Sequence, residues 1–332
     1  GATLSATLLE YLRGWNTEAD RETVAGIPIP ARLWQADTFG QDLVLNVRNN
    51  AVYYWQASSN LSASGSLVPL QPEYPNGHAI DMSSSAFGAD SWAPTIATKV
   101  LVTEERHIVV IGTNDPTYTP NSALQDPMLV RWSDQENPYV WYPTATNTAG
   151  FQRLAYGSEL ITTEKTRQEV LIWSDNALYS MRYLGPPYIF GFNTLSVEVT
   201  IASPNCVSTA SNITYWMGLD KFYVYSGRVD TLPCSIRQYI FDDINLNELD
   251  LIVSGTNEKF NEVWWLYPSL NSVEIDRYTV YNYLEKLWYY GTIDRTSWLD
   301  SHIRTYPLAT TNNHLLLQEF GVDDAFDPND PQ

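Results

Sequence analysis

The sequence is short of three kinds of residue or segment, and each shortage argues against a class of protein. Its 332 residues include only two cysteines, Cys206 and Cys234, which are too few for a disulfide framework and whose pairing stays open. Lysine and arginine together number 19 and form no cluster of the kind that holds nucleic-acid phosphates. No apolar run reaches the roughly 18 residues that a transmembrane helix needs, so we expect no stable membrane insertion.

The motifs of common catalytic and metal sites are also missing. The histidines, which show no metal-ligand spacing, are His78, His107, His302 and His314. No His-Glu-x-x-His, Cys-x-x-Cys, P-loop or Gly-x-Ser-x-Gly pattern occurs. The segment Asp243–Asn247 resembles the start of a calcium loop, but Glu248 stands where that loop needs glycine. We therefore predict a protein that is not an enzyme, with no catalytic, cofactor-binding or metal-binding residues.

Aromatic residues and negative charge, by contrast, are abundant. Aromatic side chains make up 13% of the chain, with 12 tryptophans and 22 tyrosines, and such a composition predicts a folded protein. Only 17% of the residues are charged, yet the net charge is −19. The length suits one large all-β domain or two ordinary ones. Because the sequence begins at Gly1 without methionine, we expect a fragment or a processed product.

A short phrase occurs twice near the middle of the chain. Val130–Asp134 and Leu171–Asp175 both end in Trp-Ser-Asp, and an aromatic run follows each of them, at Tyr139–Tyr142 and Leu178–Met181. Serine and aspartate end strands because their short side chains bond the nearby backbone. A repeat of about 40–50 residues built from short strands indicates a β-propeller blade. Chance coincidence of the two triplets in a tryptophan-rich chain is the alternative.

Five units of strand, polar turn and aromatic-rich strand recur along the chain. Their turns are Arg48–Asn50, Glu104–Arg106, Glu164–Arg167, Ser211–Asn212 and Asn257–Lys259. The spacing is irregular, which favours an all-β β-propeller with irregular blades, inserted loops and few short helices. One short helix is predicted within residues 235–247, from the four-residue spacing of its isoleucines. A β-sandwich is the structural rival.

These units predict three segments. Residues 1–32 are an N-terminal segment or linker, and residues 33–308 form the propeller, with inserted loops at 56–94 and 112–127. Residues 309–332 become polar and acidic and are expected to be a linker or tail. Four close carboxylates there would be costly to bury, and these are Asp323, Asp324, Asp327 and Asp330.

Two groups of residues have both a functional and a structural interpretation. Asp134, Asp175 and Asp220 are the candidates for a glycosidase, which needs two carboxylates about 5–10 Å apart, but all three fit ordinary hairpin turns. His107, at the junction of a turn and a strand, is interpreted as structural. Several tryptophans fit a sugar-binding platform or, better, the core between blades; these are Trp55, Trp141, Trp173, Trp216, Trp264, Trp265 and Trp288.

Six phrases spread along the chain carry a family resemblance. They are Ala93–Thr98, Trp132–Pro138, Thr144–Gly150, Tyr183–Tyr188, Trp216–Tyr223 and Phe260–Trp265. Through these phrases, the stretch from about Leu33 to Pro307 resembles structural proteins of tailed bacteriophages, in particular the nozzle or tail hub protein of short-tailed phages (podoviruses).

The resemblance implies a virion protein of the phage tail, assembled in the host cytoplasm. It implies a propeller-bearing subunit that joins copies of itself in a ring, a hexamer, below the portal and adaptor proteins. Tail fibres or spikes would attach outside, and DNA would pass through the centre during genome ejection without sequence-specific binding. A ring needs a head-to-tail interface, for which loops 56–94 and 112–127 are candidates. The alternative is a receptor- or carbohydrate-binding protein associated with tail fibres or spikes.

Overall fold

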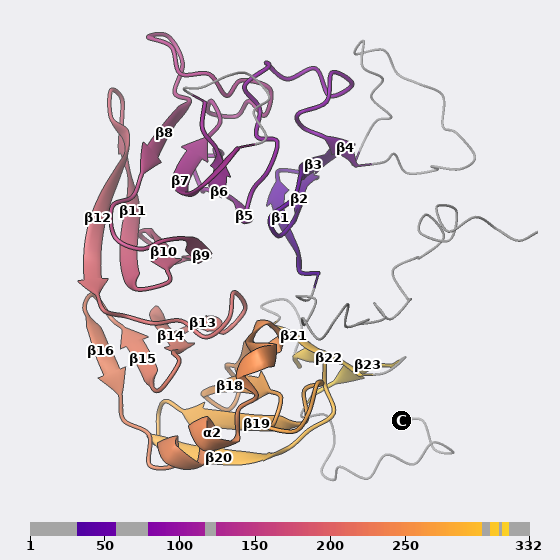
Figure 1. Ribbon diagram of the computed structural model, residues 1–332, viewed down its shortest axis with the longest axis vertical. Coiled ribbons are helices and arrows are strands. Elements are labelled where there is room, and N and C mark those ends of the chain that lie inside the picture. Colours follow the sequence, from indigo (N-terminus) through magenta and orange to yellow (C-terminus); the bar gives the residue numbers. More distant parts are fainter. Residues whose placement is uncertain (1–31, 58–78, 117–123, 301–305, 312–313, 319–332) are drawn as a thin grey trace, which may run out of the picture. The chain divides into compact units, whose positions relative to one another are not determined.

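The computed structural model describes residues 32–57, 79–116, 124–300, 306–311 and 314–318, and all of them belong to one compact unit that begins at Arg32. In this part of the chain the strands form six antiparallel sheets in chain order, which makes a six-bladed β-propeller (Figure 1). The predicted fold class is therefore confirmed. The predicted N-terminal segment lies almost entirely outside the described residues.

The first three blades have four strands each. Blade 1 contains β1 (Trp34–Phe39), β2 (Asp42–Val47), β3 (Val52–Trp55) and β4 (Ile80–Asp81). Blade 2 contains β5 (Lys99–Val102), β6 (Ile108–Asn114), β7 (Gln125–Trp132) and β8 (Gly150–Arg153). Blade 3 contains β9 (Leu160–Lys165), β10 (Val170–Ser174), β11 (Ala177–Gly185) and β12 (Ile189–Val197).

The last three blades follow the same order, and the sixth has three described strands. Blade 4 contains β13 (Val207–Ala210), β14 (Ile213–Met217), β15 (Phe222–Tyr225) and β16 (Val229–Leu232). Blade 5 contains β17 (Val253–Asn257), β18 (Glu262–Tyr267), β19 (Arg277–Asn282) and β20 (Leu287–Thr292). Blade 6 contains β21 (Ser297–Leu299), β22 (Leu308–Thr311) and β23 (His314–Leu317).

The first strand of each blade is the innermost. β1 contacts β5, and the contacts continue from β5 to β9, β13, β17 and β21 in that order. Because successive strands are antiparallel, the turns fall on two opposite faces of the propeller. We call the face with the turns between first and second strands, and between third and fourth strands, the front face. The back face carries the turns between second and third strands and the connections between blades.

Aromatic side chains fill the spaces between neighbouring blades. Trp173 of blade 3 meets Trp216 of blade 4 edge to face, with 5.4 Å between ring centroids, and both side chains are fully buried. Phe222 of blade 4 packs against Trp265 of blade 5 at 4.8 Å. Large rings bury much apolar area and add a specific edge-to-face attraction. The prediction that most of these tryptophans are core is confirmed for the five that are buried, namely Trp141, Trp173, Trp216, Trp264 and Trp265.

The two Trp-Ser-Asp phrases, however, do not occupy equivalent positions. Trp132 ends β7, the third strand of blade 2, whereas Trp173 lies near the end of β10, the second strand of blade 3. The predicted hairpin is correct for the second copy only. In the first copy, residues 139–142 are not a strand: Trp141 is buried in the core, and an isolated bridge joins Asp134 to Asn137 across a tight turn. The chain returns as a strand only at β8.

The predicted end of the propeller at residue 308 is also wrong. β23 and all of β22 after Leu308 lie within the segment predicted to be an acidic tail. These strands complete a sixth blade that the five recurring units did not include. This blade is held because Leu308 and Ala309 are buried and Trp298 stacks on Trp264 of blade 5 at 5.2 Å. Strands β4 and β7 likewise extend into the two predicted loops, whose remaining central parts, 58–78 and 117–123, lie outside the described residues.

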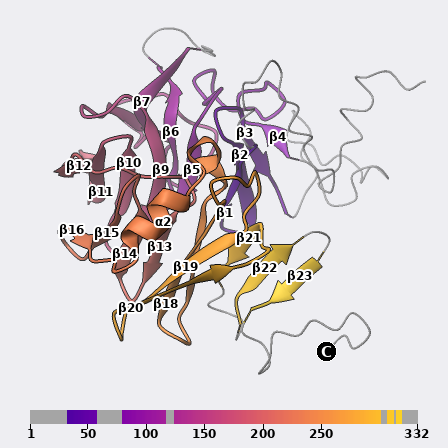
Figure 2. The ribbon, with the colours of Figure 1, turned by 60° about the horizontal axis from the view of Figure 1, so that its bottom comes forward.

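The helical content is small, as predicted. Helix α2 (Arg237–Asp243) confirms the short helix expected within residues 235–247, and the 3-10 helix η1 (Leu246–Leu251) follows it. Both belong to the connection between blades 4 and 5, and Figure 2 shows α2 beside blades 4 and 5. Among the described residues, no helix has the length and apolar character needed to cross a bilayer.

Gly255 provides a test of how the sixth blade is attached. A Cβ atom at this position of β17 would overlap the indole ring of Trp298. Gly255→Ala should therefore destabilise the protein by about 1–3 kcal/mol, the usual cost of overpacking, measured by chemical denaturation. In a Trp298→Ala background the same change should cost far less, because the ring that it meets is gone. Equal costs in both backgrounds would contradict this packing.

Candidate binding cavity

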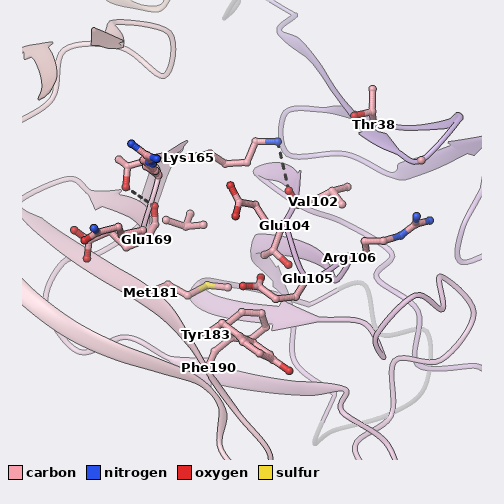
Figure 3. Close-up of a pocket in the computed structure, with 16 residues that line it drawn as sticks. Thr38, Val102, Glu104, Glu105, Arg106, Lys165, Glu169, Met181, Tyr183 and Phe190 are labelled. Carbon is pink, nitrogen blue, oxygen red and sulfur yellow. Dashed lines mark hydrogen bonds between the residues drawn. The ribbon is translucent and has the colours of Figure 1, made fainter. Parts of the chain in front are cut away.

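A cavity of about 550 Å³ opens on the front face, among the turns of the first three blades (Figure 3). Thr38 and Gly40 line it from blade 1, and Val102–Arg106 line it from the turn between β5 and β6. Lys165–Val170 contribute from the turn between β9 and β10. The volume falls in the range of about 300–1,000 Å³ that is typical of small-molecule sites.

Tight turns bring these segments together. Phe39 pairs with Asp42, so only two residues connect β1 and β2, and the first of them, Gly40, has φ 73°. Such two-residue hairpin turns require positive φ, which glycine adopts at low cost. The missing side chain at Gly40 also gives room to the guanidinium of Arg106, which would lie 3.1 Å from a Cβ atom there.

An apolar floor closes the cavity toward blade 3. It is formed by Met181, Tyr183 and Phe190, on strands β11 and β12. Phe190 packs against Trp132 of blade 2 with 5.3 Å between ring centroids. This contact joins the two blades and fixes the position of the floor.

His107 packs against the same floor from a buried position. Its side chain is buried, with its ring centroid 5.1 Å from that of Phe190. Nδ1 donates a hydrogen bond to the carbonyl oxygen of Ser133 at 2.8 Å, because a carbonyl can only accept. Burial lowers the pKa of His107, although the hydrogen bond to Ser133 opposes the change. The imidazole is therefore neutral at pH 7.

An ion pair across blades occupies one side of the cavity. The Nζ atom of Lys165 lies 2.6 Å from Oδ2 of Asp37 on β1. The same carboxylate accepts hydrogen bonds from the backbone N–H groups of Val102 and Thr38. Asp37 therefore joins blades 1, 2 and 3, and it neutralises Lys165, which lines the cavity.

Glu169 forms a second connection between blades. Its buried carboxylate accepts a hydrogen bond from Nε of Arg182 at 2.8 Å, one from Oη of Tyr225 in blade 4 at 2.5 Å, and one from the hydroxyl of Ser180. Burial alone would raise the pKa of Glu169, but the hydrogen bonds from Arg182, Ser180 and Tyr225 outweigh it and lower the pKa. Glu169 is therefore ionised at pH 7, and both of its carboxylate oxygens already accept hydrogen bonds.

The three aspartates considered for glycosidase chemistry do not converge. Asp134 follows β7 on the front face, whereas Asp175 and Asp220 lie in turns of the back face. Asp134 accepts hydrogen bonds from the N–H and the hydroxyl of Thr148, and Asp175 accepts both from Ser158. Burial would raise the pKa of Asp175, but its hydrogen bonds prevail and lower it, the opposite of what a general acid needs. The interpretation of Asp134 and Asp175 as turn residues is confirmed.

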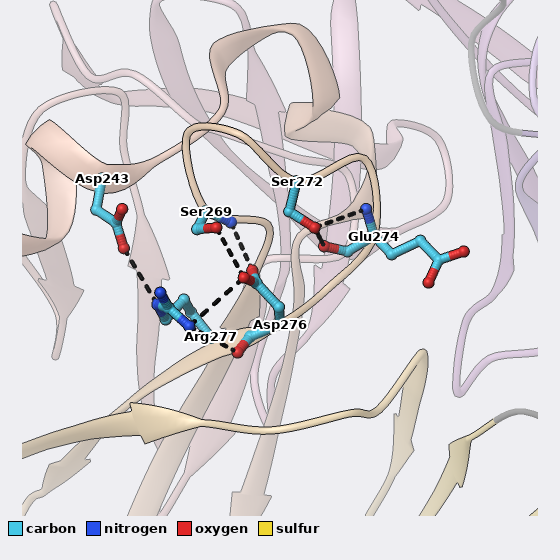
Figure 4. Close-up of polar contacts among 6 residues, drawn as sticks. All are labelled: Asp243, Ser269, Ser272, Glu274, Asp276 and Arg277. Carbon is cyan, nitrogen blue, oxygen red and sulfur yellow. Dashed lines mark hydrogen bonds and ion pairs between the residues drawn. The ribbon is translucent and has the colours of Figure 1, made fainter.

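The segment that resembled a calcium loop holds the helical connection in place instead (Figure 4). Asp243 at the end of α2 pairs with Nε of Arg277 at 3.3 Å, and Arg277 also approaches Asp276 at 3.5 Å. Asn245 caps η1 by accepting from the N–H of Asn247. In the described part of the chain no group of three or more His, Cys, Asp or Glu residues could hold a metal ion. The acidic residues 323–330 lie outside that part.

The two cysteines and the two half-buried tryptophans that the sequence singled out do not line the cavity. Cys206 is buried, Cys234 is half-buried, and both are free thiols. Burial raises the pKa of each to about 11, so neither is a reactive thiolate at neutral pH. Trp55 and Trp288 are half-buried and lie on blades 1 and 5. The sequence did identify the turns Glu104–Arg106 and Glu164–Arg167, but it held no signal that these two turns meet.

Comparison with known proteins adds similarity of structure only. No protein-family model and no curated protein matches the sequence. Hsv2 of Kluyveromyces lactis aligns over 89% of this chain and 78% of its own, with 8% identity and a TM-score of 0.45. A putative exported protein of Bacteroides fragilis aligns over 86% and 81%, with 10% identity and a TM-score of 0.39. The extracellular domain of the one-component system BT4673 from B. thetaiotaomicron aligns over 86% and 31%, with 9% identity and a TM-score of 0.43. These values assign no function to the chain.

Glu169 makes the stability of the protein depend on pH. Because its pKa is lower in the folded state, its contribution is complete above the unfolded pKa of about 4.5 and disappears as the pH falls through the folded pKa. Glu169→Gln should lower the free energy of unfolding by about 2–3 kcal/mol at pH 7, and the difference from the native protein should shrink in acid. Chemical denaturation across this pH range measures the effect. Glu258→Gln, at the exposed corresponding turn of blade 5, is the control and should change little.

Proposed function

We propose that the chain is a structural subunit of a phage tail nozzle or hub, which forms a ring-shaped conduit for genome ejection and holds fibres or spikes. The observation that carries the proposal is the resemblance of six phrases to this family. These phrases occupy turns and strand ends of the propeller. Trp132–Pro138 and Tyr183–Tyr188 lie at the front face, and Trp216–Tyr223 spans a turn at the back face. Turn residues are where a fold meets its partners.

The charge of the chain is compatible with a conduit. A net charge of −19 on 332 residues repels DNA phosphates within about 8–10 Å, the Debye length at physiological salt. A wall of this kind lets DNA pass without holding it. Acidic proteins are common, so the charge supports the proposal without carrying it.

Two exposed apolar patches suit a head-to-tail ring. The first is the hairpin tip between β11 and β12, where Leu184 is 61% exposed and Tyr188 is 77% exposed. The second lies at the outer side of blade 5, where the exposed rings of Tyr239 and Tyr290 pack at a tilt with their ring centroids 4.6 Å apart. A cyclic assembly needs two different surfaces on one copy, and tyrosine is enriched in protein interfaces. The patches lie on blades 3 and 5, which are not adjacent.

Electron microscopy of virions that contain this protein tests the proposal. We expect a six-fold ring of propellers around the tail axis, with the tip of blade 3 in one copy facing blade 5 of the next. Density only at the periphery, on fibres or spikes, would contradict the proposal and indicate a receptor-facing protein. The half-buried Trp92 and the exposed Tyr142, with ring centroids 4.9 Å apart, would then be the surface to test for sugar binding.

Two variants test whether the tip between β11 and β12 is a specific contact surface or whether any exposed apolar side chain affects incorporation into the ring. Leu184→Ser combined with Tyr188→Ser should reduce incorporation into the ring, because it removes the apolar tip. Leu219→Ser, at a back-face turn where the side chain is 48% exposed, should leave incorporation unchanged.

A further inference from the structure

Three carboxylates and three cations line the front-face cavity, but not all of them have a partner. Lys165 is neutralised by Asp37, and Arg106 lies 4.0 Å from Glu136 with its guanidinium over the ring of Phe39. Glu169, as described above, is satisfied by Arg182 and two hydroxyl groups. This leaves Glu104 and Glu105 on one turn and Arg167 on another, and none of these three side chains bonds or pairs with another described residue.

The two carboxylates face the apolar floor. In Figure 3 the side chains of Glu104 and Glu105 point from their turn toward the side of the cavity where Met181 lies, with Tyr183 and Phe190 beneath them. Glu105 is half-buried, and Glu104 is exposed. Neighbouring like charges beside an apolar surface are unfavourable unless a cation joins them.

We propose that this cavity binds an organic cation. Its ammonium or guanidinium group is held between Glu104 and Glu105. Its apolar chain or ring lies mainly on Tyr183, the exposed part of the floor, because Met181 and Phe190 are almost fully buried. Charged hydrogen bonds to carboxylates provide the polar recognition. The face of Tyr183 adds a cation–π attraction when the charge lies over it.

The same arrangement disfavours other ligands. An anion would meet two unpartnered carboxylates and only one unpartnered cation, that of Arg167. A neutral apolar molecule would cover the floor but leave Glu104 and Glu105 partly desolvated and unpaired. The net charge of −19 also attracts cations from a distance. The inference concerns this cavity alone and does not depend on the proposed assembly.

The test is a titration of the full chain with 2-phenylethylammonium at low ionic strength, followed by isothermal calorimetry. We expect saturable binding with one site for each chain, weakened by added sodium chloride. The neutral analogue 2-phenylethanol should bind at least about ten-fold more weakly, because a hydrogen bond to a charged group is worth roughly that factor or more. Equal binding of the alcohol, or no saturable binding of the amine, would overturn the proposal.

Matched variants locate the site. Glu104→Gln with Glu105→Gln should weaken binding of the amine at least about ten-fold. The melting temperature should not fall, because neither side chain bonds another described residue and the change removes an unfavourable pair of like charges. Glu258→Gln with Glu285→Gln removes the same charge from exposed turns of blade 5 on the same face and should leave binding unchanged. Equal loss in both pairs would show that only the overall charge matters and would overturn the assigned site. Tyr183→Ser should weaken binding through the floor, independently of the carboxylates.

The cation has two possible sources, and a second ligand distinguishes them. A capped phenylalanyl-lysine amide, whose only cation is its side chain, represents a basic residue of a partner protein. If it binds more tightly than 2-phenylethylammonium, the natural occupant is a lysine or arginine side chain. If only the small amine binds, the occupant is a free organic amine. Both results require Glu104 and Glu105, so both retain the proposed chemistry.

Discussion

The packing of aromatic rings between neighbouring blades is the interaction on which the rest of this structure depends. Twisted sheets arranged around an axis diverge toward the outside, and the wedge between them must be filled at the density of a protein interior. Trp173 against Trp216 and Phe222 against Trp265 fill it between blades 3 and 4 and between blades 4 and 5. The tryptophan content of the strands is thus a requirement of the architecture. Where a small residue replaces a ring, as at Gly255, the neighbouring blade provides the ring instead.

The cavity is a consequence of this packing. Because the inner strands are held side by side, the short turns of blades 1, 2 and 3 meet at the front face. Charged side chains on these turns find partners in neighbouring blades. Lys165 forms an ion pair with Asp37, and Glu169 accepts a hydrogen bond from Tyr225. Glu104 and Glu105 remain outside this network. They are the part of the site that the fold does not need, and so the part available to a ligand.

The fold could be predicted from the sequence to a large extent, and the site could not. Apolar, aromatic-rich runs ended by Ser-Asp, Asn and Gly turns are local signals, and they located most strands of blades 2 to 5. The four-residue spacing of isoleucines, also a local signal, located helix α2. The sixth blade was missed because its strands are short and contain Thr310, Thr311 and His314, and their burial depends on Trp298 reaching across to blade 5. The two Trp-Ser-Asp phrases led to a wrong prediction because the same residues end the third strand of blade 2 and the second strand of blade 3. The cavity joins turns far apart in the sequence, and no local pattern records such a meeting.

The most direct test of this account is a double-mutant cycle on Trp173 and Trp216, with leucine at each position and at both, measured by the free energy of unfolding. If the rings contribute through their mutual contact between blades, the coupling energy should be about 0.5–1.5 kcal/mol beyond the lost apolar area. Costs that add within about 0.3–0.5 kcal/mol would contradict the account, since each ring would then stabilise only its own blade.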